Sequence, residues 1–192
     1  MEPIVEGLMK QLISGDNLAL MSNKVGADDK SVKSTLEMGL PLLLGAMNNN
    51  ASKPEGINAI MNGMAQMGNN NPMDNMSSYL GAPDSFQGSD MLSSMLGSNL
   101  QPIQQSISKS TGLPLSVVGQ ILSMVLPLVI GSLSKSSSKQ NLAPEDLSKF
   151  LGEQSEMAIS TSPDAAGVMK GLFASQQSGG GLMGMIKKFL KF

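Results

Sequence analysis

The sequence contains no cysteine, histidine, tryptophan or arginine, and aromatic residues make up only 3% of its 192 residues. Without cysteine or histidine, the chain has no thiolate nucleophile, disulfide, thiolate zinc site or imidazole acid–base catalyst. Without arginine, it lacks the planar guanidinium that binds phosphate or carboxylate through two parallel hydrogen bonds. These absences exclude several common classes of enzyme and metal site.

The scarcity of aromatic residues also bears on the fold. A core of this chain must be built from aliphatic residues, alanine and the 17 methionines. Strand-rich folds draw on aromatic and β-branched residues, so this composition favours helices. The length suits one sizeable domain or two small ones with tails. The net charge of −2 gives no general electrostatic reason to bind nucleic acid.

The chain contains an internal duplication. Residues 22–52 align without a gap on residues 108–138, a shift of 86 positions. Nearly all of the matching residues are apolar or have special backbone properties, which indicates a repeated packing arrangement rather than a repeated active site. The structural residues of the repeat are the pairs Gly26 and Gly112, Pro41 and Pro127, and Gly45 and Gly131.

Each repeat unit reads as a helix, a glycine turn, a proline-interrupted apolar helix and a helix opened by Pro-Glu. We expect Pro41 and Pro127 to kink or split the apolar helices. The predicted fold is all-α, with two pseudo-symmetric three-helix repeats packed into one helical bundle. The predicted boundaries are 1–67 for the first repeat, 68–89 for a linker or mobile loop rich in Asn, Gly and Pro, 90–152 for the second repeat, and 153–192 for a C-terminal helix and tail.

Residues 113–133 carry no charge and are long enough to span a membrane. The duplicated segment in the first repeat carries Asp28, Asp29, Lys30, Lys33 and Glu37, which a helix buried in lipid tolerates poorly. We therefore expect a core helix. The N-terminal residues show no pattern of a signal peptide.

The C-terminal tail predicts a small basic amphipathic helix. Such a helix suits a groove on a partner protein or an anionic membrane surface, and the alternative is that it packs on its own domain. The glycines before it would let it leave the body of the protein. The residues of this predicted docking tail are Leu182, Met185, Ile186, Lys187, Lys188, Phe189, Lys191 and Phe192.

Other patterns give weaker indications of function. Met61, Met64, Met67, Met73 and Met76 form a thioether series that would suit Cu(I), although methionine as a core filler explains it more simply, so we predict no metal and no cofactor. Residues 108–113 resemble the opening of bacterial histone-like proteins, but no basic strand follows. The carboxylates, lysines and serines are scattered, and we predict that the protein is not an enzyme.

The order of these motifs resembles the bacterial domain-of-unknown-function family 937. The resemblance rests on residues 40–47 (LPLLLGAM), 54–56 (PEG), 91–97, 108–112 and 126–131 (LPLVIG). It covers most of residues 1–152, and the glycine-rich tail matches only in style. The resemblance implies a small helical protein with no assigned activity, so it transfers no catalytic or ligand-binding residues.

The sequence thus favours a non-catalytic helical interaction or scaffolding module, a subunit or accessory of a larger assembly. Its expected partner is another protein or a second copy of the chain, with the tail as the docking arm, and no small-molecule substrate. Two alternatives stay open: a peripheral membrane protein that binds through the tail, and a weak architectural DNA-binding protein. The expected location is the cytoplasm, with a peripheral membrane position as the alternative.

Overall fold

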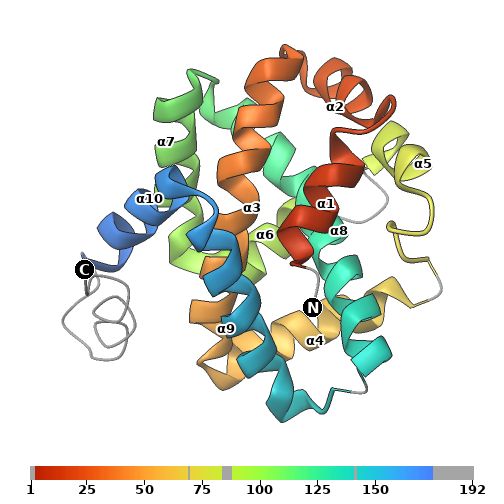
Figure 1. The fold of residues 1–192 in the computed structure, drawn as a ribbon, viewed down its shortest axis with the longest axis vertical. Helices are drawn as coiled ribbons and strands as arrows, with labels where there is room; N and C mark the ends of the chain where they lie inside the picture. Colours follow the sequence, from red (N-terminus) through yellow and green to blue (C-terminus); the bar gives the residue numbers. More distant parts are fainter. Residues whose placement is uncertain (1–2, 69, 84–87, 141, 175–192) are drawn as a thin grey trace.

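All regular structure in the part of the chain that the computed structural model describes, residues 3–68, 70–83, 88–140 and 142–174, is helical (Figure 1). This confirms the all-α prediction. The elements are α1 (Ile4–Leu12), α2 (Asn17–Val25), α3 (Asp29–Ala51), α4 (Pro54–Met67), α5 (Met76–Gly81), α6 (Gly88–Leu96), the 3-10 turn η2 (Gly97–Asn99), α7 (Leu100–Thr111), α8 (Leu115–Gln140), α9 (Pro144–Ser160) and α10 (Pro163–Ala174).

The two longest helices, α3 and α8, form the centre of the fold. Both are apolar on nearly all sides in their middle thirds, and a helix with that pattern must be surrounded by other helices. Helix α3 contacts α9, α4, α10 and α7, whereas α8 contacts α6, α4, α7 and α1. The two helices also contact each other, and Figure 1 shows α9 alongside the lower half of α3. The apolar residues of both helices therefore share a single core.

Each long helix follows a turn closed by a glycine. Gly26 and Gly112 end α2 and α7 in the left-handed conformation, with φ of 67° and 75°. Glycine adopts this conformation without the steric cost that a Cβ imposes. The backbone N–H of each glycine donates to the carbonyl of a serine four residues earlier, Ser22 or Ser108. The glycine turns predicted from the duplication are thus present in both places.

The prolines lie inside continuous helices, so neither α3 nor α8 is split into two segments, which was one of the two expected outcomes beside a kink. Proline has no N–H, and Pro41 therefore leaves the carbonyl of Glu37 without its usual helical donor. The hydroxyl of Ser162, at the start of α10, reaches this carbonyl at 3.4 Å. The helix continues because its flanking apolar residues are buried and packing holds the backbone in place.

Pro127 has the same effect on the carbonyl of Ser123 in α8. The backbone of Gly88 packs directly on this carbonyl, so closely that a Cβ at position 88 would overlap it. The neighbouring carbonyl of Met124 accepts a hydrogen bond of 2.8 Å from the hydroxyl of Tyr79. Segments outside the helix thus contact the carbonyls around the interruption.

Asp28 caps the start of α3 by accepting a hydrogen bond of 3.0 Å from the backbone N–H of Ser31. The interactions with the Ser31 side chain and with its N–H lower the pKa of Asp28 below its ordinary value of 3.8. A carboxylate whose pKa is depressed by folding contributes stability above the ordinary pKa, and this contribution is lost as the pH falls through the folded-state pKa.

We therefore expect Asp28→Ala to lower the melting temperature at neutral pH, where the charged cap is intact. The difference from the wild type should shrink as the pH falls below 3.8, because protonation weakens the cap in the wild type as well. Thermal unfolding followed by circular dichroism at both pH values measures this. Asp28→Asn, which keeps the acceptor oxygen without the charge, is the control and should lose less than Asp28→Ala at neutral pH.

The segment expected to be a linker or mobile loop, 68–89, contains helical structure. Its described residues include α5 and the first residues of α6. Met76, Tyr79 and Leu80 of α5 are buried, and α5 packs against α2. We call residues 70–83 the strap, because this segment runs from α4 to the α2 side of the fold and is anchored on α8.

Helix α8 is the one helix of the described ranges that is long and apolar enough to cross a membrane by length and composition, with a mean hydropathy of 1.9. The core helix of a globular protein meets the same criterion. The structure buries the apolar residues of α8 from Val118 to Leu133 in the shared core, as we expected from the duplication, whereas Leu115 at its start is exposed.

Candidate functional site

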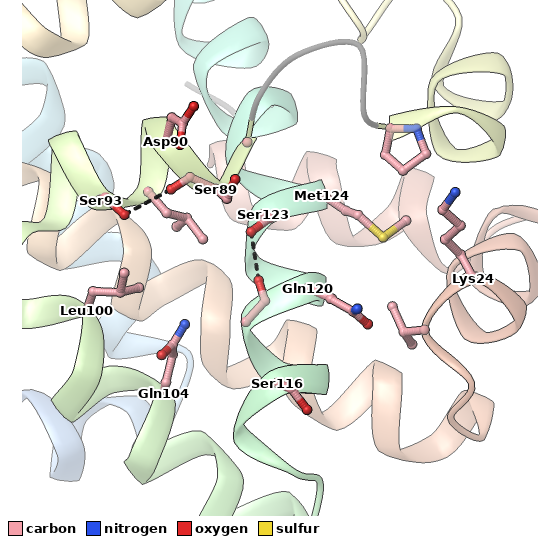
Figure 2. A pocket seen from close by; sticks show the side chains of 15 residues that line it. Lys24, Ser89, Asp90, Ser93, Leu100, Gln104, Ser116, Gln120, Ser123 and Met124 are labelled. Carbon is pink, nitrogen blue, oxygen red and sulfur yellow. Dashed lines mark hydrogen bonds between the residues drawn. The ribbon is translucent and has the colours of Figure 1, made fainter.

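The described residues enclose a groove of about 610 Å³ between α2, α6, α7 and α8 (Figure 2). We call it the serine groove, because four of its lining residues are serines. It is lined by Lys24, Val25, Pro83, Gly88, Ser89, Asp90, Leu92, Ser93, Leu100, Gln104, Ser116, Gly119, Gln120, Ser123 and Met124.

Small residues on α8 form the floor of the serine groove. Ser116, Gly119 and Ser123 recur at helical spacing and so share one face of α8. Gly119 lets the amide of Gln104 approach, since a Cβ at 119 would lie 3.0 Å from its Nε2 atom. The hydroxyl of Ser123 donates back to the carbonyl of Gly119 at 2.9 Å. The groove is open here because Ser116, Gly119 and Ser123 place only small side chains on this face of α8.

The walls of the serine groove supply neutral hydrogen-bonding groups and apolar contacts. Gln104 and Gln120 contribute carboxamides from α7 and α8, and the partly exposed Leu100 contributes apolar surface. The two charged residues, Lys24 on α2 and Asp90 on α6, lie on opposite sides of the groove in Figure 2. Hydroxyls and carboxamides both donate and accept hydrogen bonds, which matches the alternating N–H and C=O groups of a peptide backbone.

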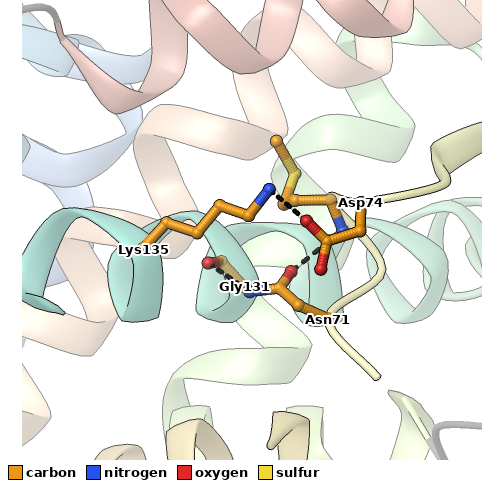
Figure 3. Close-up of polar contacts among 5 residues, drawn as sticks. Asn71, Asp74, Gly131 and Lys135 are labelled. Atoms are coloured by element: carbon orange, nitrogen blue, oxygen red, sulfur yellow. Dashed lines mark hydrogen bonds and ion pairs between the residues drawn. The ribbon is translucent and has the colours of Figure 1, made fainter. Parts of the chain in front are cut away.

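The strap is anchored to α8 by two polar contacts near Gly131 (Figure 3). The Nδ2 atom of Asn71 donates to the carbonyl of Gly131 at 2.9 Å, and its Oδ1 accepts from the N–H of Met73 at 2.9 Å. The ammonium of Lys135 lies 2.6 Å from the carboxylate of Asp74. Gly131 makes this approach possible, because a Cβ there would overlap the Asn71 amide.

Tyr79 provides the third anchor, and its removal should be measurable. We expect Tyr79→Phe to lower the free energy of unfolding by about 0.5 to 1.5 kcal/mol, because the carbonyl of Met124 loses a buried hydroxyl donor and keeps only its helical one. Urea unfolding measures the change. Ser77→Ala is the control: it removes an exposed hydroxyl bonded to Asn17, and its effect should stay within about 0.5 kcal/mol. An equal loss in both variants would contradict the anchoring role of Tyr79.

Gly45 and Gly131, which the duplication aligns, are each covered by a segment that follows a Pro-started helix in the chain. Gly45 on α3 is covered by the side chain of Met169, which belongs to α10 and follows α9. Gly131 on α8 is covered by Asn71 and Met73, which belong to the strap and follow α4. Each glycine therefore receives the segment that follows a Pro-started helix.

The methionine series from 61 to 76 lies in and against the core. Met67 and Met76 are buried, and Met61, Met64 and Met73 are partly buried and pack against the core cluster. This placement fits the use of methionine as a core filler. Within the described ranges, no group of three or more His, Cys, Asp or Glu residues is arranged to hold a metal ion.

All eight residues of the predicted docking tail lie beyond residue 174, outside the described residues. The structural residues of the repeat are all described, and they lie at the two turns and along the two central helices. Sequence reasoning did not single out Asn71, Tyr79, Gln104 or Gln120. For Asn71, the following Pro72 is the local signal of a turn.

Comparison with known proteins identifies the family. The model of a family described as bacterial protein of unknown function (DUF937) matches residues 7–136. Because this match covers more than half of the chain, the protein belongs to that family, as the motifs at 40–47 and 126–131 predict. No curated protein and no solved structure matches the chain.

Proposed function

We propose that this member of the DUF937 family is a non-catalytic helical interaction module. It is built from two pseudo-symmetric units that complete each other, and it binds an extended polypeptide segment in the serine groove. The chemistry of that groove is the observation that carries the proposal. Its serine and glutamine side chains suit the recognition of a peptide backbone, and the partly exposed Leu100 suits an apolar side chain of the same segment.

The pattern of helix contacts supports the pseudo-symmetric arrangement. If α1, α2, α3 and α4 correspond to α6, α7, α8 and α9, each contact between units should occur twice. Four pairs of contacts follow this rule. The contact of α3 with α9 corresponds to that of α8 with α4, and the contact of α1 with α8 corresponds to that of α6 with α3. The contact of α1 with α9 corresponds to that of α6 with α4, and the contact of α2 with α8 corresponds to that of α7 with α3. In this proposal the two units depend on each other, since the Pro-started helix of each one packs on the central helix of the other, although α4 also packs on α3 of its own unit.

A groove-filling variant tests the proposed function. Gln120 is exposed in the groove, so Gln120→Trp should occupy the groove without disturbing the core. Gln105→Trp, at an exposed position of α7 outside the groove, is the matched control. In native pull-downs analysed by mass spectrometry, we expect the wild type and Gln105→Trp to retain the same protein partner and Gln120→Trp to lose it. Equal recovery by all three, or no partner for any, would contradict the proposal.

A second candidate is peripheral membrane binding, favoured by the lysines and apolar residues of 182–192. In this case the protein would work in the cytoplasm at a membrane surface. Flotation with anionic liposomes should retain the full chain and lose a chain truncated after residue 181. Equal flotation of both chains, or of neither, would remove the tail as a membrane anchor.

A further inference from the structure

The duplication provides a reference for the serine groove, because the face of α8 that lines it has an aligned counterpart on α3. On α3 this face is solvated: Lys33 and Glu37 are exposed, and the Lys33 ammonium lies 3.8 Å from the Glu37 carboxylate. On α8 the same face carries no charge. The aligned residues are Lys30, Lys33, Ser34 and Glu37 on α3, and Ser116, Gly119, Gln120 and Ser123 on α8.

The difference in charge extends to the start of the two helices. The exposed Asp29 of α3 aligns with Leu115 of α8, which is 48% exposed and precedes the groove residue Ser116. No charged residue occurs between positions 110 and 134. Helix α3 shows that a charged residue fits this position, so the packing of the fold does not require a leucine there. An exposed apolar side chain beside an uncharged groove is typical of a surface that another molecule covers.

Asp90 marks the other end of the serine groove. It lies exposed in the first turn of α6, and Gly88 at the start of this helix packs on the carbonyl of Ser123. Figure 2 shows Asp90 and Ser116 at opposite ends of the groove. Lys24, the other charged residue of the lining, already interacts within the chain. We therefore assign the charge preference of the groove to Asp90.

The length of the groove sets the spacing of the groups that it can bind. Ser116 and Ser123 are two helical turns apart, which corresponds to about 10 Å along α8. An extended peptide advances about 3.3 Å per residue. A bound segment therefore brings side chains about three to five positions apart to the two ends of the groove.

We propose that the serine groove selects an extended segment of a partner protein by two side chains about three to five residues apart. An apolar side chain covers Leu115 at one end, and a lysine or arginine pairs with Asp90 at the other. The inference rests on the proposed function, because it specifies the sequence of the segment that the groove binds. Between the two ends, the uncharged side chains of α8 contact the backbone of the segment.

A displayed library of random peptides, panned on the isolated full-length protein, tests this specificity. The wild type should enrich peptides with Leu, Ile, Met or Phe about three to five positions from Lys or Arg. Asp90→Lys should enrich Asp or Glu in place of the cation, and Asp90→Asn should lose the charge preference. Leu115→Asp should lose only the apolar preference. Its stability should be kept, because an acid suits the first turn of a helix, as Asp29 does in α3.

Two control variants change the same kinds of residue outside the groove. Asp164→Lys reverses an acid in the first turn of α10, and Ile13→Ser removes an exposed apolar side chain after α1. Both should keep the preferences of the wild type. For a peptide that the wild type enriches, Asp90→Lys and Leu115→Asp should each weaken binding about 3- to 10-fold in fluorescence polarisation, and the controls should not.

Unchanged preferences in the Asp90→Lys and Leu115→Asp chains would overturn the proposal. If Gln120→Trp nevertheless loses those peptides, binding in the groove stands without this specificity. A wild type that enriches no peptide would contradict both the specificity and the proposed function.

Discussion

Leu122→Ala is expected to lower the free energy of unfolding by about 2 to 5 kcal/mol, the range for removing a fully buried leucine and leaving a cavity. Leu122 lies on α8 at the point where this helix meets α3, and only 1% of its surface is exposed. Its Cδ2 atom would lie 2.9 Å from a Cβ at Gly39 of α3. The side chain fills the space that the glycine leaves, so its loss opens the contact between the two central helices.

Gly39 provides an internal check on this interpretation. In the wild type, the methyl group of Gly39→Ala would press on Leu122, and its gain in helix propensity of about 1 kcal/mol should be offset. In the Leu122→Ala chain the same methyl group enters the cavity. We therefore expect the double variant to be more stable than Leu122→Ala alone, as measured by urea unfolding. Additive effects would show that the two residues do not share this space.

Gly131→Ala is expected to cost about 1 to 3 kcal/mol, in spite of alanine's better helix propensity. The new methyl group overlaps the amide of Asn71, which must leave its buried place and give up the hydrogen bond to the Gly131 carbonyl. The strap then loses one of its anchors on α8. The displacement should also expose the strap to proteolysis.

Gly45→Ala is the matched control, because Gly45 occupies the equivalent position on α3. There the methyl group meets the end of the Met169 side chain, which is flexible and can adjust. We expect a change of less than about 1 kcal/mol, with either sign. A loss for Gly45→Ala as large as that for Gly131→Ala would contradict the distinction between a flexible side chain and an amide held by hydrogen bonds.

Local signals account for what the sequence predicted well. The glycine caps at Gly26 and Gly112, the Pro-started helices α4 and α9, and the apolar stripes of α3 and α8 all follow from properties of a few neighbouring residues. The duplication strengthened each of these predictions, because the same pattern occurs twice. It also predicted that residues 113–133 form a core helix, whereas their composition alone would also fit a membrane span.

The predictions that failed concern contacts between distant segments. Pro41 and Pro127 were expected to kink or split their helices. Neither helix is split, because burial keeps each one continuous, and partners such as Ser162 lie against a carbonyl that the proline leaves without a donor. The strap has the composition of a loop, and its order depends on Asn71 and Tyr79 reaching carbonyls on α8. The serine groove likewise depends on which helices meet at Gly119.

The proposed dependence of the two units on each other can be tested by dividing the chain between residues 85 and 86. Each central helix packs on the Pro-started helix of the other unit, so each fragment lacks part of the surface that covers its own apolar helix. We predict that fragments 1–85 and 86–192 each lack cooperative thermal unfolding when alone, as measured by circular dichroism. Mixed in equal amounts, they should form a one-to-one complex that regains the helical signal and a single cooperative transition. Cooperative unfolding of either fragment alone would contradict the proposed dependence.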